Sequence, residues 1–268
     1  MTQPPTMGNP KLFRRVICFS LTVSLLIVLG SSGLADYTPS DASDRPSDNI
    51  RNTVGGSRAY TPPPTSRTSG EDHTGGGVRG CGDNIATLAP RLNFVGQSST
   101  TRPTFVWYMF GEAAEPLEFH LYHYQADGSL EAVLIDPIGS STQGYMAYTL
   151  PSGQPDLTVG ETYLWQVVLY CDPNLEEVGR WASADVEIVA LPADLMAGLP
   201  EGTLPQAQAY ARAGLWYEAM AAVYDATTPE EKAFRQDLLL DLADLEEQSE
   251  QESIINLSSQ LRQIAEMP

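Results

Sequence analysis

The stretch "TYLWQVVLYC" at residues 162–171 decides the fold that we predict for this chain. Its alternate residues Tyr163, Trp165, Val167 and Leu169 are all large and apolar. Side chains two positions apart in a β-strand point to the same face, so this spacing predicts a strand with one face in a hydrophobic core. The aromatic and β-branched residues that fill most of the run also favour strands.

Six similar runs lie on either side of this one, separated by residues that favour turns. The turn segments include "ADGS" at 126–129 and "PSGQPD" at 151–156, rich in residue types that adopt tight turns. About seven short strands at this spacing predict an antiparallel, Ig-like β-sandwich over residues 81–192. The expected strands are 85–95, 104–110, 117–124, 130–136, 145–150, 162–171 and 181–191.

The spacing of apolar residues becomes helical in the C-terminal part of the chain. Helices are expected at residues 204–213, at 215–226, from 229 onward and within 254–266. Gly214 separates the first two helices, and Thr228 with Glu231 forms a capping box that begins the third. The chain is therefore predicted to be an α+β protein in which a small helical hairpin region, 203–268, follows the sandwich.

The hairpin sequence "GLWYEAMAAVYDA" at 214–226 has small residues where a tetratricopeptide-like helix pair has them. One such unit cannot bury its own apolar face, so this face has to contact another surface. We expect it to pack on the folded body of the chain, and a groove for a partner segment is the alternative. The face consists of Trp216, Ala219, Val223 and Ala226.

The N-terminus has the pattern of a secretory signal. Basic residues, Arg14 and Arg15 among them, precede the uncharged run "VICFSLTVSLLIVLG" at 16–30, and small residues follow it. The apolar run is shorter than the roughly 20 residues that a membrane span needs. We therefore expect a signal peptide at 1–35 that is cleaved, a periplasmic or secreted location, and no stable membrane insertion after cleavage.

Residues 36–80 are rich in Ser, Thr, Pro and Gly and contain almost no large aliphatic side chains. Such a segment cannot bury enough apolar surface to offset the loss of chain entropy on folding. It is therefore predicted to be a disordered tether between the signal peptide and the sandwich.

Two of the three cysteines lie outside the predicted signal peptide, namely Cys81 and Cys171. In an exported chain an even pair of cysteines predicts one disulfide bond. The bond would close a loop of some 90 residues, which is worth roughly 4 to 5 kcal/mol in the chain-entropy model.

Composition argues against several classes of function. The net charge of −19 disfavours binding to nucleic acid or anionic lipid, because both need basic patches. His120 and His123 are three apart on one expected strand, so they point to opposite faces and are not expected to share a metal. We accordingly assign no catalytic, cofactor-binding or metal-ligating residue and expect no cofactor.

Two further patterns have a structural and a functional interpretation. Asp172, Asn174 and Glu176 in "DPNLEE" have the alternate spacing that begins a calcium loop, but the central Gly and distal Glu of that loop are missing, so we expect a plain turn. The aromatic residues of the sandwich are expected in its core, with a sugar-binding platform as the alternative. They are Trp107, Tyr108, Tyr122, Tyr124, Trp165 and Trp181.

Several segments together resemble a known family: "GGGVRGC", "RPTFVWY" at 102–108, "LTVGETYLWQVVLYCDPN" at 157–174 and "YARAGLWYEAM" at 210–220. The chain resembles, over about residues 75–245, a family of uncharacterised cyanobacterial exported proteins classed only as a domain of unknown function. The resemblance implies a cyanobacterial envelope setting. It implies no activity and transfers no functional residue.

These observations favour a non-enzymatic exported envelope protein that acts as an interaction or structural module, with an unknown envelope protein or glycan as partner. The alternative is a hydrolase or a carbohydrate-binding domain that acts on envelope glycans. A hydrolase requires carboxylates that converge in one pocket, whereas a sugar-binding domain requires exposed, coplanar aromatic rings.

Overall fold

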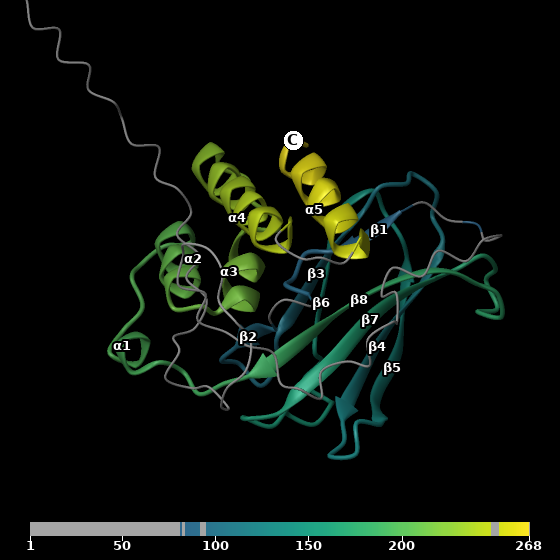
Figure 1. Cartoon of the computed structure of the whole chain (residues 1–268), viewed down its shortest axis with the longest axis horizontal. Helices are drawn as coiled ribbons and strands as arrows, with labels where there is room; N and C mark the ends of the chain where they lie inside the picture. The colour runs from purple at the N-terminus through teal and green to yellow at the C-terminus, as the bar shows by residue number, and fades with distance from the viewer. Residues whose placement is uncertain (1–80, 82–83, 92–94, 248–251, 268) are drawn as a thin grey trace, which may run out of the picture. The chain divides into compact units, whose positions relative to one another are not determined.

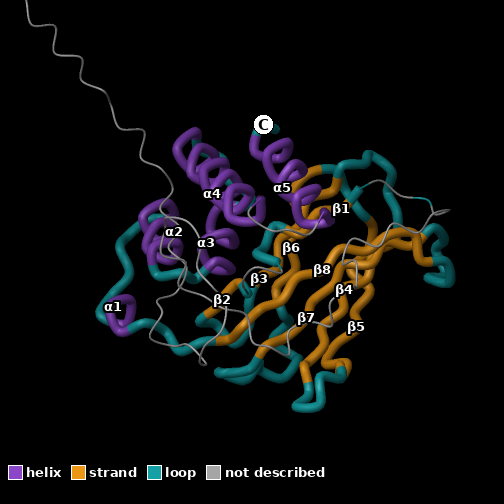
Figure 2. The backbone as a smooth tube through the Cα atoms, in the orientation of Figure 1, coloured by secondary structure: helices purple, strands orange, loops and turns teal. Residues whose placement is uncertain are grey.

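A computed structural model describes residues 81, 84–91, 95–247 and 252–267 (Figure 1). All of these residues belong to one compact unit, Gly33–Pro268. The described part of the chain is an α+β structure with eight strands in two sheets and five helices, and Figure 2 shows the strands in orange and the helices in purple. The predicted signal peptide, 1–35, and the predicted tether, 36–80, lie outside the described residues.

The larger sheet has five strands in the order β2-β8-β7-β4-β5. They are β2 Gly96–Ser98, β4 Pro116–Tyr124, β5 Leu130–Ser140, β7 Thr162–Tyr170 and β8 Val178–Ile188. The stretch 162–171 contributes β7, the middle strand, which pairs antiparallel with both β4 and β8. One pair departs from the antiparallel prediction, because β2 pairs parallel with β8.

The smaller sheet has three antiparallel strands in the order β1-β3-β6. They are β1 Ile85–Thr87, β3 Thr104–Met109 and β6 Gly144–Thr149. The prediction of one first strand over 85–95 is wrong: β1 ends at Thr87, and the next strand, β2, begins at Gly96 in the other sheet. Pro90 lies between them, and it lacks the N–H that a continuing strand would need. The described chain thus has eight strands where about seven were expected.

Aromatic rings from both sheets meet in one core. The ring of Phe105 on β3 lies 4.9 Å from that of Phe119 on β4 and 5.2 Å from that of Trp165 on β7. Phe119 also stacks on Tyr148 of β6 at 4.4 Å between ring centroids. Contacts of this kind add about 0.5–1.5 kcal/mol each to the free energy of burial. The two sheets therefore face each other across a layer of aromatic side chains.

Five helices follow the strands in the described chain: α1 Ala193–Met196, α2 Thr203–Arg212, α3 Trp216–Val223, α4 Pro229–Glu247 and α5 Glu252–Ala265. Gly214 has a φ of 76°, a left-handed conformation that ends α2 and that favours glycine. The predicted capping box begins α4: the Glu231 N–H donates to Thr228 Oγ1 at 3.2 Å, and the Thr228 N–H donates to Glu231 Oε2 at 3.3 Å. The short helix α1 was not predicted.

Helix α3 is joined to both sheets by buried hydrogen bonds. Trp216 Nε1 donates to the carbonyl of Leu88, just after β1, at 2.8 Å. The Tyr217 hydroxyl accepts a hydrogen bond from Trp165 Nε1 and donates one to the carbonyl of Asp185 on β8, both at 2.7 Å. Each of these indole and phenol groups keeps a hydrogen-bond partner although it is withdrawn from water.

The hairpin face packs inside the chain's own core. Trp216, Ala219 and Val223 are 0% exposed and belong to one hydrophobic cluster with residues of both sheets. Ala226 lies beyond the end of α3 and is half-buried. These three side chains pack against the folded body of the chain. The strands within 81–192 and the helices within 203–268 thus share one core.

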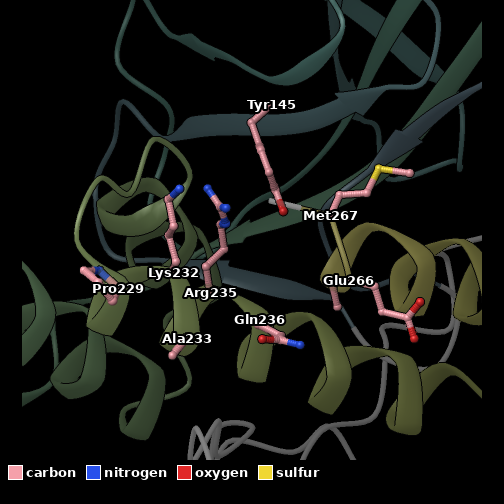
Figure 3. A pocket seen from close by; sticks show the side chains of 9 residues that line it. Tyr145, Pro229, Lys232, Ala233, Arg235, Gln236, Glu266 and Met267 are labelled. Carbon is pink, nitrogen blue, oxygen red and sulfur yellow. The ribbon is translucent and has the colours of Figure 1, made fainter.

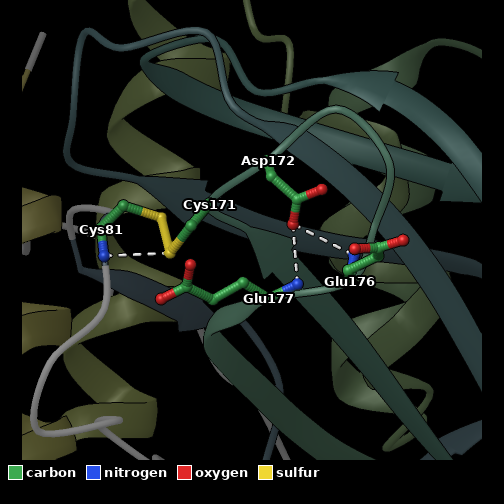
Figure 4. The surroundings of a disulfide bond; sticks show 5 residues. All are labelled: Cys81, Cys171, Asp172, Glu176 and Glu177. Atoms are coloured by element: carbon green, nitrogen blue, oxygen red, sulfur yellow. Dashed lines mark hydrogen bonds between the residues drawn. A yellow bond between two sulfur atoms is a disulfide. The ribbon is translucent and has the colours of Figure 1, made fainter.

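The predicted disulfide between Cys81 and Cys171 is confirmed (Figure 4). Its Cα atoms are 5.2 Å apart, and the two residues are 90 positions apart in the sequence. Gly179 of β8 lies directly against the bond, because a Cβ added there would be 2.8 Å from the carbonyl oxygen of Cys81. The disulfide therefore fixes residue 81 beside the end of β7 and the start of β8.

We expect Trp216→Ala to lower the free energy of unfolding by about 3 to 5 kcal/mol, because it leaves a cavity and removes the donor to Leu88. The measurement is a urea melt beside Trp181→Ala, a matched control in which the lost side chain is only half-buried and the loss should be smaller. A loss for Trp216→Ala no larger than that of an ordinary surface substitution, about 0.5 kcal/mol, would contradict its role in the core.

Removing the disulfide in the double variant Cys81→Ala, Cys171→Ala should lower the free energy of unfolding by up to about 4 to 5 kcal/mol, because the unfolded chain regains the freedom of a long loop. Denaturant melts of wild type and variant, each with and without reductant, measure this effect. Reductant should shift the midpoint of the wild type only. Equal midpoints for the wild type under both conditions would show that the bond does not stabilise the protein.

Candidate functional site

A hollow of about 310 Å³ lies where the start of α4 and the end of α5 meet strand β6 (Figure 3). We call it the cationic pocket, because two basic side chains of α4 line it. Its polar and flexible lining residues are Tyr145, Lys232, Arg235, Gln236, Glu266 and Met267.

The sequence of α4 brings the two cations to one side. Lys232 and Arg235 are three positions apart, and residues at this spacing share a helix face. Pro229 at the first position of α4 also lines the pocket. Figure 3 shows the ammonium of Lys232 and the guanidinium of Arg235 directed toward Tyr145, which extends from β6. The pocket thus combines side chains of the helical region with one of the smaller sheet.

Arg235 is held firmly in place. Its side chain is 5% exposed, and its Cζ lies 3.9 Å from the centroid of the Tyr145 ring in a cation–π contact. One guanidinium nitrogen, Nη1, donates to the carbonyl of Tyr224 at 2.7 Å. A guanidinium carries five N–H donors, so this bond leaves others for a ligand.

Within the described ranges, neither Lys232 nor Arg235 forms an ion pair with a carboxylate. Glu266 is the acidic residue among those lining the pocket, and Figure 3 shows its carboxylate directed away from both cations. In a chain with 34 acidic and 15 basic residues, this pocket is lined by two cations and one carboxylate.

Tyr145 contributes a neutral hydroxyl. Burial raises the pKa of Tyr145, an effect that the charge of Arg235 partly offsets, so its phenol stays protonated at neutral pH. Neighbouring Tyr108 donates a hydrogen bond to Met267 Sδ at 2.8 Å and contacts the Tyr145 ring edge-on at 5.1 Å. The pocket therefore presents ammonium, guanidinium, amide and hydroxyl donors. This set suits a carboxylate or another anion.

A second hollow, of about 300 Å³, lies between α2, α3 and the start of β3. We call it the Glu218 hollow. Its lining consists of Thr100, Thr104, Tyr210, Tyr217, Glu218, Ala221 and Ala222.

The carboxylate of Glu218 is satisfied on one side only. Oε1 accepts hydrogen bonds from the N–H groups of Ser99 and Thr100 at 2.6 and 3.0 Å, and from the hydroxyls of Ser98 and Ser99 at 3.0 Å each. Oε2 is buried and has no hydrogen-bond partner among the described residues. Burial raises the pKa of Glu218, and the hydrogen bonds to Oε1 oppose this shift only in part.

The "DPNLEE" segment forms the expected turn. Asp172 Oδ1 accepts from the Asn174 N–H at 2.8 Å. Its Oδ2 accepts from the N–H groups of Glu176 and Glu177 at 3.0 and 2.7 Å (Figure 4). These bonds, the one from Glu177 first, lower the pKa of Asp172. Both oxygens of the Asp172 carboxylate thus accept hydrogen bonds from the backbone of its own loop. Across the described ranges no group of three or more His, Cys, Asp or Glu side chains is arranged to hold a metal ion.

The two histidines on β4 have separate partners. His120 Nε2 lies 3.0 Å from Glu118 Oε2, and its Nδ1 lies 3.0 Å from the Tyr122 hydroxyl. His123 Nε2 instead contacts Glu161 Oε2 at 3.1 Å. The two imidazoles thus contact different carboxylates.

The aromatic residues considered as a sugar platform divide into two groups. Trp107 and Trp165 are 0% exposed and Tyr108 is buried, so these three belong to the core. Tyr122, Tyr124 and Trp181 are half-buried on strands of the larger sheet. The first group therefore cannot offer a face to a sugar ring.

The residues of the two hollows were not predicted from the sequence as site residues. Lys232 carries one usable signal, because it is the only lysine after the predicted signal peptide and lies three positions before an arginine on a helix. Tyr145 and Glu218 carry no sequence signal, because a tyrosine in a strand and a glutamate on a short helix are both common. Their roles depend on partners that are distant in the sequence.

Comparison with known proteins gives one family match. The family described as Domain of Unknown Function (DUF928) matches residues 74–254. A search of curated proteins finds no match. A similar solved structure is that of a lytic polysaccharide monooxygenase important for efficient utilization of chitin in Cellvibrio japonicus, with 12% identity and a TM-score of 0.26. The similarity covers 37% of this chain and 58% of that one, and it carries no argument about fold or function.

None of the helices in the described part of the chain is both long and apolar enough to cross a membrane.

We expect Glu218→Gln to remove a pH dependence of stability. Because burial raises the folded-state pKa of Glu218, the folded state binds this proton more tightly than the unfolded state, so wild type should gain stability as pH falls. The gain should develop between the raised folded-state pKa and the ordinary glutamate value of 4.5. Urea melts of both proteins from pH 8 to pH 5 measure it as the difference between them. A difference that does not change with pH would contradict the raised pKa.

Proposed function

Because the chain belongs to the DUF928 family, which is a domain of unknown function, we propose a role from its own geometry. We propose that it is a non-enzymatic exported module that binds an acidic group of an envelope protein or glycan in the cationic pocket. The observation that carries this proposal is the convergence of Lys232 and Arg235 on Tyr145 without an ion-pair partner among the described residues.

The chemistry of the pocket favours a carboxylate. A guanidinium and an ammonium together provide charge-assisted hydrogen bonds, which are about twice as strong as neutral ones. The volume of about 310 Å³ is at the small end of ligand sites. It suits one acidic residue or one acidic sugar unit of a larger partner better than it suits a complete cofactor.

We propose an Ig-like β-sandwich as the scaffold and a cyanobacterial envelope as the setting. The aromatic core shared by the two sheets supports a sandwich. The disulfide supports an oxidising compartment outside the cytoplasm, and thus export through the predicted signal peptide.

The hydrolase alternative is supported less well. Acid–base hydrolysis of a glycoside needs two carboxylates on either side of one bond. Among the described residues, the cationic pocket is lined by one carboxylate, Glu266, and the second hollow also by one, Glu218. An interaction module needs no such pair.

The test is the charge reversal Lys232→Glu, measured by calorimetric titration with tetragalacturonate and with a tetraglutamate peptide as defined acidic glycan and protein probes. We expect wild type to bind at least one probe and the variant to bind it about tenfold or more weakly, the usual effect of losing a charge-assisted hydrogen bond. Arg212→Glu, which reverses an exposed cation on α2, is the matched control and should bind like wild type.

Failure of wild type to bind either probe would contradict the proposal. Equal weakening by Arg212→Glu would also contradict it, because the effect would then come from net charge and not from the pocket. Chromatography of tetragalacturonate after long incubation distinguishes the alternatives, because shortened products would favour a hydrolase.

A further inference from the structure

We propose that the Glu218 hollow is a binding site for a primary ammonium group, such as that of an alkylamine. This inference concerns a second site and is independent of the cationic pocket. It rests on the one-sided hydrogen bonding of Glu218 and on the chemistry of the surrounding walls.

The two oxygens of Glu218 have opposite environments. Oε1 accepts four hydrogen bonds from the segment that ends β2 and continues to Thr100. Oε2 accepts none from the described residues, although it too is withdrawn from solvent. A buried carboxylate oxygen without a donor is costly, and each such atom in a native structure calls for an explanation. A ligand that donates a hydrogen bond to Oε2 is such an explanation.

The walls of the hollow suit an ammonium on a short alkyl chain. Tyr210 is half-buried, and its hydroxyl makes no hydrogen bond to the described residues. The Thr100 hydroxyl already accepts from the Arg102 N–H at 3.2 Å and that of Thr104 pairs with Thr149 Oγ1 at 2.7 Å, and each oxygen has a second lone pair that can accept. Ala221 and Ala222 provide an apolar wall. An ammonium has three donors and no acceptor, so one carboxylate oxygen and two hydroxyl oxygens can satisfy it fully. The ring of Tyr210 adds a cation–π surface.

Charge selects an organic monocation over a metal ion. Among the described residues that line this hollow, Glu218 is the only carboxylate, whereas divalent cations take several oxygen ligands, usually with more than one carboxylate. The net charge of −19 attracts cations to the protein from a distance. Since Oε2 is shielded from water, a cation that pairs with it meets a lower dielectric than at the surface, and their attraction is stronger.

The experiment is a calorimetric titration with n-butylammonium as the probe and butan-1-ol as its neutral counterpart, at pH 7.5. We expect wild type to bind n-butylammonium and not butan-1-ol. Glu218→Gln keeps the shape of the side chain and removes the charge, so it should weaken binding about tenfold or more. Glu230→Gln changes an exposed acid on α4 and should bind like wild type.

A second variant tests whether the volume of the Glu218 hollow is needed, without changing the charge of Glu218. Ala222→Leu fills the hollow and leaves Glu218 and its donors unchanged, so it too should abolish binding of n-butylammonium. If Glu218→Gln loses its near-ultraviolet circular dichroism, this variant decides the question alone.

Three results would overturn the proposal. The first is a wild type that does not bind n-butylammonium, which would mean that the hollow holds solvent only. The second is binding that persists in Ala222→Leu or in folded Glu218→Gln. The third is an equal loss in Glu230→Gln, which would assign the binding to the acidic surface as a whole.

Discussion

The hydroxyl of Tyr217 joins helix α3 to two strands of the larger sheet by buried hydrogen bonds. It accepts a hydrogen bond from Trp165 on β7 and donates one to the Asp185 carbonyl on β8, within a buried aromatic cluster. In a low-dielectric interior a hydrogen bond is strong and its loss leaves an unpaired group, so this geometry tolerates little displacement. The position of the Tyr217 ring also requires a glycine at residue 96 on β2, because a Cβ there would lie 2.9 Å from the ring.

Both hollows depend on the position of this helix. Glu218 is the next residue along α3, so docking of Tyr217 brings its carboxylate to the segment after β2. At the other end of α3, the carbonyl of Tyr224 accepts from Arg235 and so sets the guanidinium over Tyr145. A shift of α3 would therefore disturb a carboxylate site and a cation site together, although they share no lining residue.

Local pattern was enough to predict the features that depend on neighbours in the sequence. The alternation in β7 and the capping box of Thr228 and Glu231 are of this kind, and the disulfide followed from the count of cysteines in an exported chain. The parallel pairing of β2 with β8 was not predictable in this way, because it joins a three-residue strand to a distant one. Likewise, nothing local to Tyr145 or Glu218 indicates that a helix cation or a loop amide will meet it.

The anion binding that we propose for the cationic pocket would discriminate among anions in a particular way. The net charge of −19 repels a free anion at long range, whereas Lys232 and Arg235 attract it only at close range. At physiological ionic strength screening acts over about 8 Å, so the long-range repulsion is weakened more than the attraction inside the pocket. Small anions then gain little binding free energy, because only the two cations offset the cost of removing water from the anion. A carboxylate on a partner that makes further contacts around the pocket gains more, and this difference favours recognition of a macromolecule.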